Sequence, residues 1–206
     1  MFCISHSETK GNTTQTFLKG YYGAAAAPHI MDFLTTMQES ANATKYYMRF
    51  SFAGVTAPFL TPSVVLRGGV SLAAAKRGAA GVAMHVQHVT QSSLGMYYIF
   101  LKRWQELADY ANTSKIPWPI EPTLEGAFET FAQSVNLTTA TYGRGVPISE
   151  GGPSIDLHAL HASLFVPCPA GWTRHQPQPA PCVPIPQSCA TSTGPQVRER
   201  EILVLT

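Results

Sequence analysis

Mostly apolar side chains recur every three or four residues along residues 82 to 111. The positions are Val82, Val86, Val89, Ser93, Tyr97, Phe100, Trp104, Leu107 and Ala111. This spacing places them on one face of an α-helix and does not fit a strand. Such a helix would span roughly 45 Å at about 1.5 Å per residue, so other helices must pack along it to cover its apolar stripe. The pattern predicts one long amphipathic helix whose stripe belongs to the core.

Two helices are predicted on the N-terminal side of this stretch. Residues 15 to 19 have the pattern of the last turns of a helix that Gly20 stops. Pro28 then suits the first turn of a second helix, whose apolar positions continue to Ala41. Residues 45 to 58 are less regular and predict either a short extended piece or a helix end.

A clearer helix start lies at Thr61 and Pro62, where an N-cap threonine precedes a proline at the first helical position. This helix should continue to Ala80. Its interior pair Gly68 and Gly69 costs about 1 kcal/mol per glycine relative to alanine. We therefore expect packing to hold this helix, with a neighbouring helix crossing close to the glycines.

Two prolines at 117 and 119 cannot lie inside a helix, so residues 116 to 119 form a rigid connector. Residues 121 to 123 then open one more helix, with Leu124, Phe128, Phe131 and Val135 on one side. The whole pattern predicts an all-α bundle of four to five helices around the long one, with an irregular C-terminal tail. The predicted divisions are a flexible N-terminus at 1–14, a helical domain at 15–140, a loop-rich extension at 141–165 and a proline- and cysteine-rich tail at 166–206.

Composition narrows the class of function. The 206 residues are 45% hydrophobic and 13% charged, with a net charge of +2 and basic pairs only at 76–77 and 102–103. This distribution offers no basic face for a nucleic acid backbone. No apolar run reaches the roughly 18 residues of a membrane span. The N-terminus also lacks the basic start and apolar core of a signal peptide.

Two features nevertheless indicate a secretory history. Each of the four asparagines begins an N-x-S/T sequon, and these N-glycosylation candidates are Asn12, Asn42, Asn112 and Asn136. Three of the four cysteines lie in the proline-rich tail, and the disulfide candidates are Cys168, Cys182, Cys189 and Cys3. Cysteines clustered where no core is available suit disulfides in an oxidising compartment, while free thiols in a disordered tail are the alternative. We expect a secreted or lumenal protein, with an intracellular location as the alternative.

Three segments carry a family resemblance. They are FLKGYYGAAAAPHIMDFLTTMQ, PFLTPSVVLRGGVSLAAAKRGA and YYIFLKRWQELADYA. The matching positions are Phe17, Gly20, Tyr21, Tyr22, Gly23, Ala25, Ala26, Leu60, Thr61, Pro62, Arg103 and Trp104. Together they resemble, over roughly residues 15 to 135, the helical C-terminal region of glycoside-hydrolase-like proteins that carry the DUF4838 domain. In that family a (β/α)8 barrel related to α-glucuronidases and hexosaminidases precedes the helical region.

The resemblance implies that the catalytic carboxyl groups would come from the barrel. A glycosidase needs two of them, about 5 Å or about 6.5 to 9.5 Å apart, and this chain lacks the repeated strands and helices of a barrel. Glu121, Glu125 and Glu129 recur every four residues and predict a solvated helix face. We therefore expect no catalytic residue and no cofactor, and a non-catalytic accessory domain whose partners are an upstream barrel of the same protein and carbohydrate. The alternative is a helical scaffold subunit of a larger assembly.

Other motifs are incomplete. His85 and His88 lie one helical turn apart, and the candidate metal-ligand pattern D-x-H-x-x-H is formed by Asp156, His158 and His161. Neither pattern supplies three or four ligands at short spacing, so we predict no metal site. The glycine-rich residues 142–147 lack the Lys-Ser/Thr of a P-loop and predict an ordinary loop. Trp104 could stack on a sugar, but it falls on the buried stripe, which favours a core position.

Overall fold

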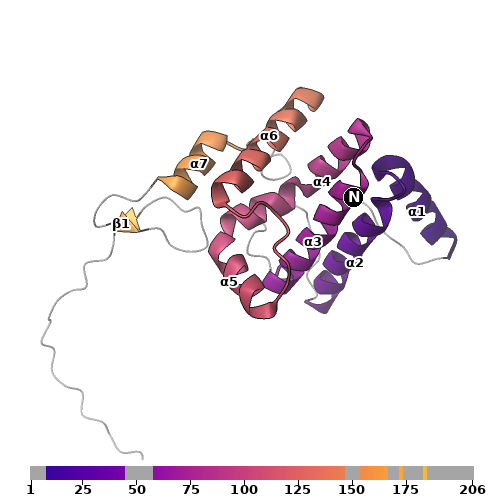
Figure 1. The fold of residues 1–206 in the computed structure, drawn as a ribbon, viewed down its shortest axis with the longest axis horizontal. Coiled ribbons are helices and arrows are strands. Elements are labelled where there is room, and N and C mark those ends of the chain that lie inside the picture. Colours follow the sequence, from indigo (N-terminus) through magenta and orange to yellow (C-terminus); the bar gives the residue numbers. More distant parts are fainter. Residues whose placement is uncertain (1–7, 45–57, 147–153, 167–171, 174–182, 185–206) are drawn as a thin grey trace, which may run out of the picture.

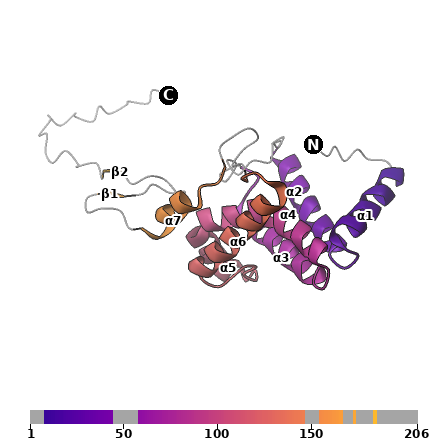
Figure 2. The ribbon, with the colours of Figure 1, turned by 90° about the horizontal axis from the view of Figure 1, so that it is seen from above.

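The computed structural model describes residues 8–44, 58–146, 154–166, 172–173 and 183–184. Helices dominate this part of the chain, and they form one elongated bundle that extends from α1 at one end to α7 at the other (Figures 1 and 2). The elements are α1 (Glu8–Tyr22), α2 (Ala27–Ala43), α3 (Pro62–Gly78), α4 (Ala83–Lys102), α5 (Trp104–Ser114), α6 (Leu124–Tyr142), α7 (Leu157–Phe165), β1 (Trp172–Thr173) and β2 (Val183–Pro184). The two short strands pair antiparallel. The predicted all-α bundle is confirmed.

The N-cap predicted at Thr61 is confirmed, and the structure shows a second threonine cap at Thr123. The Thr61 hydroxyl accepts a hydrogen bond from the Val64 N–H at 3.4 Å, and Pro62 begins α3. The Thr123 hydroxyl accepts from the Gly126 N–H at 3.1 Å at the start of α6. These side chains satisfy backbone donors that have no partner inside the helix. Local sequence therefore sets both helix starts.

The interior glycines of α3 lie at close crossings, as predicted. A Cβ on Gly68 would come within 2.7 Å of the Met37 methyl carbon of α2. A Cβ on Gly69 would come within 2.8 Å of the Phe100 ring of α4. The absence of side chains at both positions lets α3 lie against α2 on one side and α4 on the other, and this close packing offsets the cost of glycine in a helix.

The single long helix predicted for residues 82 to 111 is wrong. Arg103 leaves the helical conformation at φ −122° and ψ 26°, and it separates α4 from α5. Its guanidinium instead bonds the backbone carbonyl of Leu60 and the carboxylate of Glu106. At this break the chain leaves the line of α4, and α5 packs against α3.

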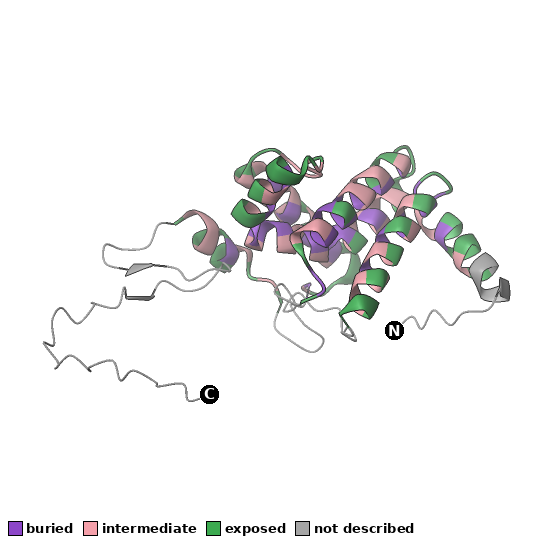
Figure 3. Cartoon of the chain, turned by 90° about the horizontal axis from the view of Figure 1, so that it is seen from below, coloured by how far each residue is buried: buried purple, intermediate pink, exposed green. Residues whose placement is uncertain are grey.

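α4 is buried on two sides, which the single predicted stripe did not show. Val89, Met96 and Phe100 join a core with α2, α3 and α5. On the other side, Leu94, Tyr98 and Leu101 meet α6 and α7, where Phe131, Val135 and Leu160 complete a second core. Figure 3 shows the buried residues concentrated in the interior of the bundle.

Three further differences from the prediction concern the start of α1, the end of α1 and the presence of α7. α1 begins at Glu8, inside the segment predicted as a flexible N-terminus, and it continues past Gly20 to Tyr22. α7 lies in the segment 141–165 that was predicted to be loop-rich. Its start signal was present in the sequence, because Asp156 caps it by accepting from the Ala159 N–H at 3.0 Å.

Among the helices that the structure describes, none has the length and apolarity needed to cross a membrane.

Candidate functional site

The Gly-Tyr-Tyr-Gly segment, residues 20 to 23, lies at the end of α1 and packs against the first half of α4. Gly23 follows the last residue of α1 and has a φ of +91°, a backbone conformation that residues other than glycine rarely adopt. It also lies against His85, because a Cβ at Gly23 would be 2.7 Å from the imidazole Nδ1. Gly23 therefore permits both the turn and the close approach, and it places Tyr21 and Tyr22 beside α4.

Tyr21 and Tyr22 are fixed to α4 by polar and ring contacts. The Tyr21 ring stacks on His88 with 3.6 Å between centroids and 5° between planes. Nδ1 of the same histidine lies 2.7 Å from the Tyr21 carbonyl oxygen. The Tyr22 hydroxyl is 2.8 Å from the Ser92 hydroxyl. Phe17, one turn earlier on α1, stacks on Tyr21 at 5.4 Å.

The end of α6 reaches the same region from the other side of α4. The Tyr142 hydroxyl donates to Gln91 Oε1 at 2.8 Å, and Gln87 Nε2 donates to the Thr141 hydroxyl at 2.7 Å. Burial raises the pKa of Tyr21, and the nearby Tyr142 hydroxyl raises it further. Tyr142 therefore lies close to Tyr21, and three helices that are distant in sequence meet here.

We call the five residues Phe17, Tyr21, Tyr22, His88 and Tyr142 the aromatic face. Phe17 is 48% exposed and Tyr142 is 54% exposed, although both have large apolar rings. Met84, at 58% exposure, lies one turn before His88 on α4. An exposed apolar cluster of this kind is typical of an interaction surface. Rings, amides, hydroxyls and an imidazole together suit binding by stacking and hydrogen bonding.

The two histidine patterns of the sequence are used for packing and capping. His88 bonds and stacks with Tyr21, as described above, and His85 lies against Gly23. Asp156 caps α7, and His161 packs edge-on against Phe128 at 5.2 Å. Within the ranges that the structure describes, no group of three or more potential ligands could hold a metal ion.

Two of the matching motifs meet at a structural contact. Arg103 Nη1 donates to the Leu60 carbonyl oxygen at 2.6 Å, so the Arg-Trp pair is bonded to the Leu-Thr-Pro helix start. Trp104 is partly buried and packs edge-on against Trp118 at 4.9 Å between centroids. Trp104 therefore contributes to the core, as the position of the stripe predicted.

Glu121 differs from its predicted place on a solvated helix face. Glu125 and Glu129 are exposed on α6, but Glu121 precedes that helix and is partly buried. Its Oε1 accepts from the Thr130 hydroxyl at 2.8 Å. The four-residue spacing of the three glutamates did not predict the burial of Glu121, because α6 begins only at residue 124 and Glu121 lies before it.

The glycosylation candidates lie on the surface where the structure describes them. Asn42, Asn112 and Asn136 are exposed, near the end of α2, near the end of α5 and within α6. The side chain of Asn12 lies outside the described residues, and so do all four disulfide candidates.

No protein-family model matches the chain, and no curated protein or solved structure matches it significantly. The resemblance to DUF4838 proteins therefore stays a prediction.

Proposed function

We propose that this chain is a non-catalytic helical accessory module of a longer carbohydrate-active protein, and that its aromatic face contacts a (β/α)8 barrel of that protein. The observation that supports this most is the exposure of Phe17 and Tyr142, two rings that are already held in place. A hydrogen bond to Gln91 of α4 holds Tyr142, and stacking on Tyr21 holds Phe17. Rings fixed in this way lose little conformational entropy when a partner covers them.

The composition of the aromatic face favours a protein partner over a free sugar. Tyrosine and phenylalanine are enriched in the buried centres of protein interfaces, and this surface contains three tyrosines and one phenylalanine. Sugar binding at its edge is compatible with this role, because the exposed ring of Tyr142 lies next to the amide of Gln91.

The identity of the natural protein is tested by an intact mass of the natively produced chain, measured before and after removal of N-glycans. A mass that includes upstream barrel sequence, together with a loss of glycan mass, supports the proposal. An unglycosylated mass of 22.3 kDa contradicts it.

The contact itself is tested by hydrogen exchange in the parent protein and in the isolated chain. We expect slower exchange at residues 83 to 92 in the parent, because the barrel would cover the start of α4. Phe17→Ser together with Tyr142→Ser should remove this protection. Val166→Ser is the matched control, since Val166 is 50% exposed but lies at the end of α7. Equal exchange in parent and isolated chain would show that the face is free.

The second candidate is a helical scaffold subunit of a larger assembly. The same exposed apolar residues support it, because a partner other than a barrel could cover them. The two proposals differ in the upstream reading frame, which encodes a barrel only in the first case.

A further inference from the structure

A pocket of about 330 Å³ lies between α3, the second half of α4 and the connector before α6. It is separate from the aromatic face, and neither proposed function uses it. Gly69 forms part of its wall, and a Cβ there would lie 2.8 Å from both Phe100 and Pro119. The volume is near the lower end of the range for small-molecule sites, roughly 300 to 1,000 Å³.

One part of the lining is apolar. Leu72 of α3, Met96 and Phe100 of α4, and Ile120 of the connector contribute it. Phe100 is fully buried and held edge-on by Trp118, with 5.4 Å between ring centroids. This part of the pocket can accommodate a hydrocarbon group of a ligand.

A second part of the lining accepts hydrogen bonds. Glu121 Oε1 lies 3.5 Å from the Tyr97 hydroxyl and 2.8 Å from that of Thr130. Glu121 Oε2 is buried and has no hydrogen-bond partner. Such an acceptor is costly unless a donor reaches it. Burial raises the pKa of Tyr97 far above its usual value, with the Glu121 carboxylate as a further cause, so Tyr97 stays a neutral phenol.

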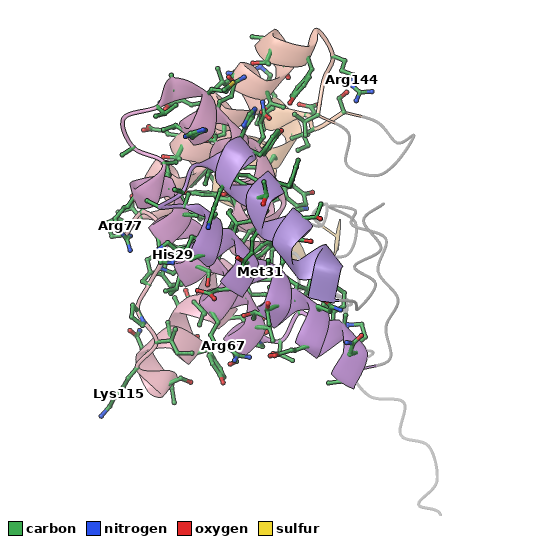
Figure 4. The ribbon with its side chains drawn as sticks, turned by 90° about the vertical axis from the view of Figure 1, so that its right-hand side faces the viewer. His29, Met31, Arg67, Arg77, Lys115 and Arg144 are labelled. Atoms are coloured by element: carbon green, nitrogen blue, oxygen red, sulfur yellow. The ribbon has the colours of Figure 1, made fainter. Side chains whose placement is uncertain are left out.

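The third part of the lining is cationic. Lys76 and Arg77 occupy the last turn of α3, and both are exposed while lining the pocket. Figure 4 shows Arg77 extending outward from the edge of the bundle. Among the described residues, the one ion pair is between Arg103 and Glu106, so neither cation has an acidic partner there. The pocket thus combines a carboxylate, an apolar wall and two cations.

We propose that this pocket binds a small zwitterion with an apolar side chain, of which a free hydrophobic α-amino acid is the simplest case. The Glu121 side chain would turn its buried Oε2 into the pocket and accept from the ligand's ammonium group. The ligand's carboxylate would meet Lys76 and Arg77, and its side chain would lie against Ile120 and Met96. A simple organic anion would leave Glu121 without a donor, and a simple amine would face two cations.

The test titrates the full chain, labelled with ¹⁵N, with three compounds and follows its amide signals by NMR. L-Phenylalanine has both charges, 3-phenylpropanoate lacks the ammonium, and 2-phenylethylamine lacks the carboxylate. For a ligand of about 12 non-hydrogen atoms we expect a Kd on the order of 0.1 to 1 mM. The two analogues should bind roughly 10-fold more weakly, because each loses a charge-assisted contact.

One single and one double substitution assign the two charged contacts. Glu121→Gln keeps the oxygen that accepts from Thr130, and it should make phenylalanine and 3-phenylpropanoate bind equally. Arg77→Ala combined with Lys76→Ala should make phenylalanine and 2-phenylethylamine bind equally. Arg67→Ala is the control, since Arg67 is exposed on α3 outside the pocket.

A pocket-filling variant keeps the test decisive if Glu121→Gln does not fold. Ala73 lines the pocket and is partly exposed, so Ala73→Phe should occupy the space and abolish binding. Equal binding of the three compounds, absence of binding up to about 10 mM, or signal changes confined to the aromatic face would each overturn the proposal. Loss of the amino acid site would leave the barrel contact intact, so the two proposals fail independently.

Discussion

Arg103 lies at the break between α4 and α5, and its side chain bonds residues on both sides of it. Its Nε and Nη2 donate to the Glu106 carboxylate at 2.8 and 2.7 Å, and its Nη1 donates to the Leu60 carbonyl oxygen. Arg103 is 8% exposed, whereas the Glu106 side chain is 48% exposed. The hydrogen bonds from Arg103 are the main cause of the lowered pKa of Glu106. This contact joins the start of α3 to the junction between α4 and α5.

Replacing Arg103 by methionine should lower the free energy of unfolding by about 2 to 4 kcal/mol. The change removes the contact to Glu106 and leaves the Leu60 carbonyl without its guanidinium donor. Urea denaturation measures the effect. Arg67→Met is the control and should change stability by less than about 0.5 kcal/mol, because Arg67 is exposed. A similarly small loss for Arg103→Met would show that the guanidinium does not hold the junction.

Lys102 should make stability depend on alkaline pH. Burial lowers its pKa to about 8 from an ordinary value of 10.5, although its ammonium lies 4.9 Å from the centre of the Tyr98 ring. Between these two pKa values the unfolded chain binds a proton that the folded chain has released, so the free energy of unfolding rises with pH. Because Lys102 is only half-buried, the gain between pH 8 and 10 should be about 1 kcal/mol after solvent screening.

The measurement is urea denaturation from pH 7 to pH 10 in the original chain and in Lys102→Met. The variant should lose this part of the pH dependence and be more stable than the original chain at pH 7. An unchanged pH profile in Lys102→Met would assign the effect to other groups.

Helix packing makes two interior glycines differ in their tolerance of a side chain. Gly69 lies within α3 where a Cβ would meet Phe100 and Pro119 at 2.8 Å, whereas a Cβ on Gly95 of α4 would have nothing within 4 Å. The intrinsic preference of a helix for alanine is the same at both positions. Packing therefore decides the sign of the effect at each one.

Gly95→Ala should raise the free energy of unfolding by about 0.5 to 1 kcal/mol. Alanine has a higher helix propensity than glycine, and it lowers the conformational entropy of the unfolded chain. Gly69→Ala should lower it by about 1 to 2 kcal/mol, because overpacking exceeds the gain in helix propensity. Thermal unfolding of the two variants side by side gives the comparison. Equal effects would show that α3 and α4 are not in close contact at Gly69.

The bundle as a whole leaves three of the four glycosylation candidates exposed. Asn42, Asn112 and Asn136 are exposed, and none belongs to the aromatic face. Glycans at these positions would extend into solvent without displacing core residues, so the fold is compatible with passage through the secretory route.

Peptide mapping of the chain produced in a secretory host should therefore find N-glycans at these positions. Each Asn→Gln substitution should remove one glycan mass and change stability by less than about 0.5 kcal/mol, because the side chains are exposed. Unmodified peptides at every sequon would instead support the intracellular alternative.

The sequence by itself determined the features that depend on neighbouring residues. The caps at Thr61 and Thr123 and the proline at the start of α2 are local, so their patterns predicted three helix starts. The all-α class followed from the same periodicity. The glycine pair in α3 also indicated a close crossing, because a helix keeps such a pair only where packing compensates for it.

Only the tertiary structure decided the features that depend on distant partners. The break at Arg103 depends on a carbonyl group 43 residues earlier in the chain. The partial burial of Glu121 depends on Tyr97, and the aromatic face depends on α1 and α6 meeting on α4. Periodicity describes a residue's position on its own helix and contains no information about which other helix will cover it. Both candidate binding surfaces lie between helices for this reason.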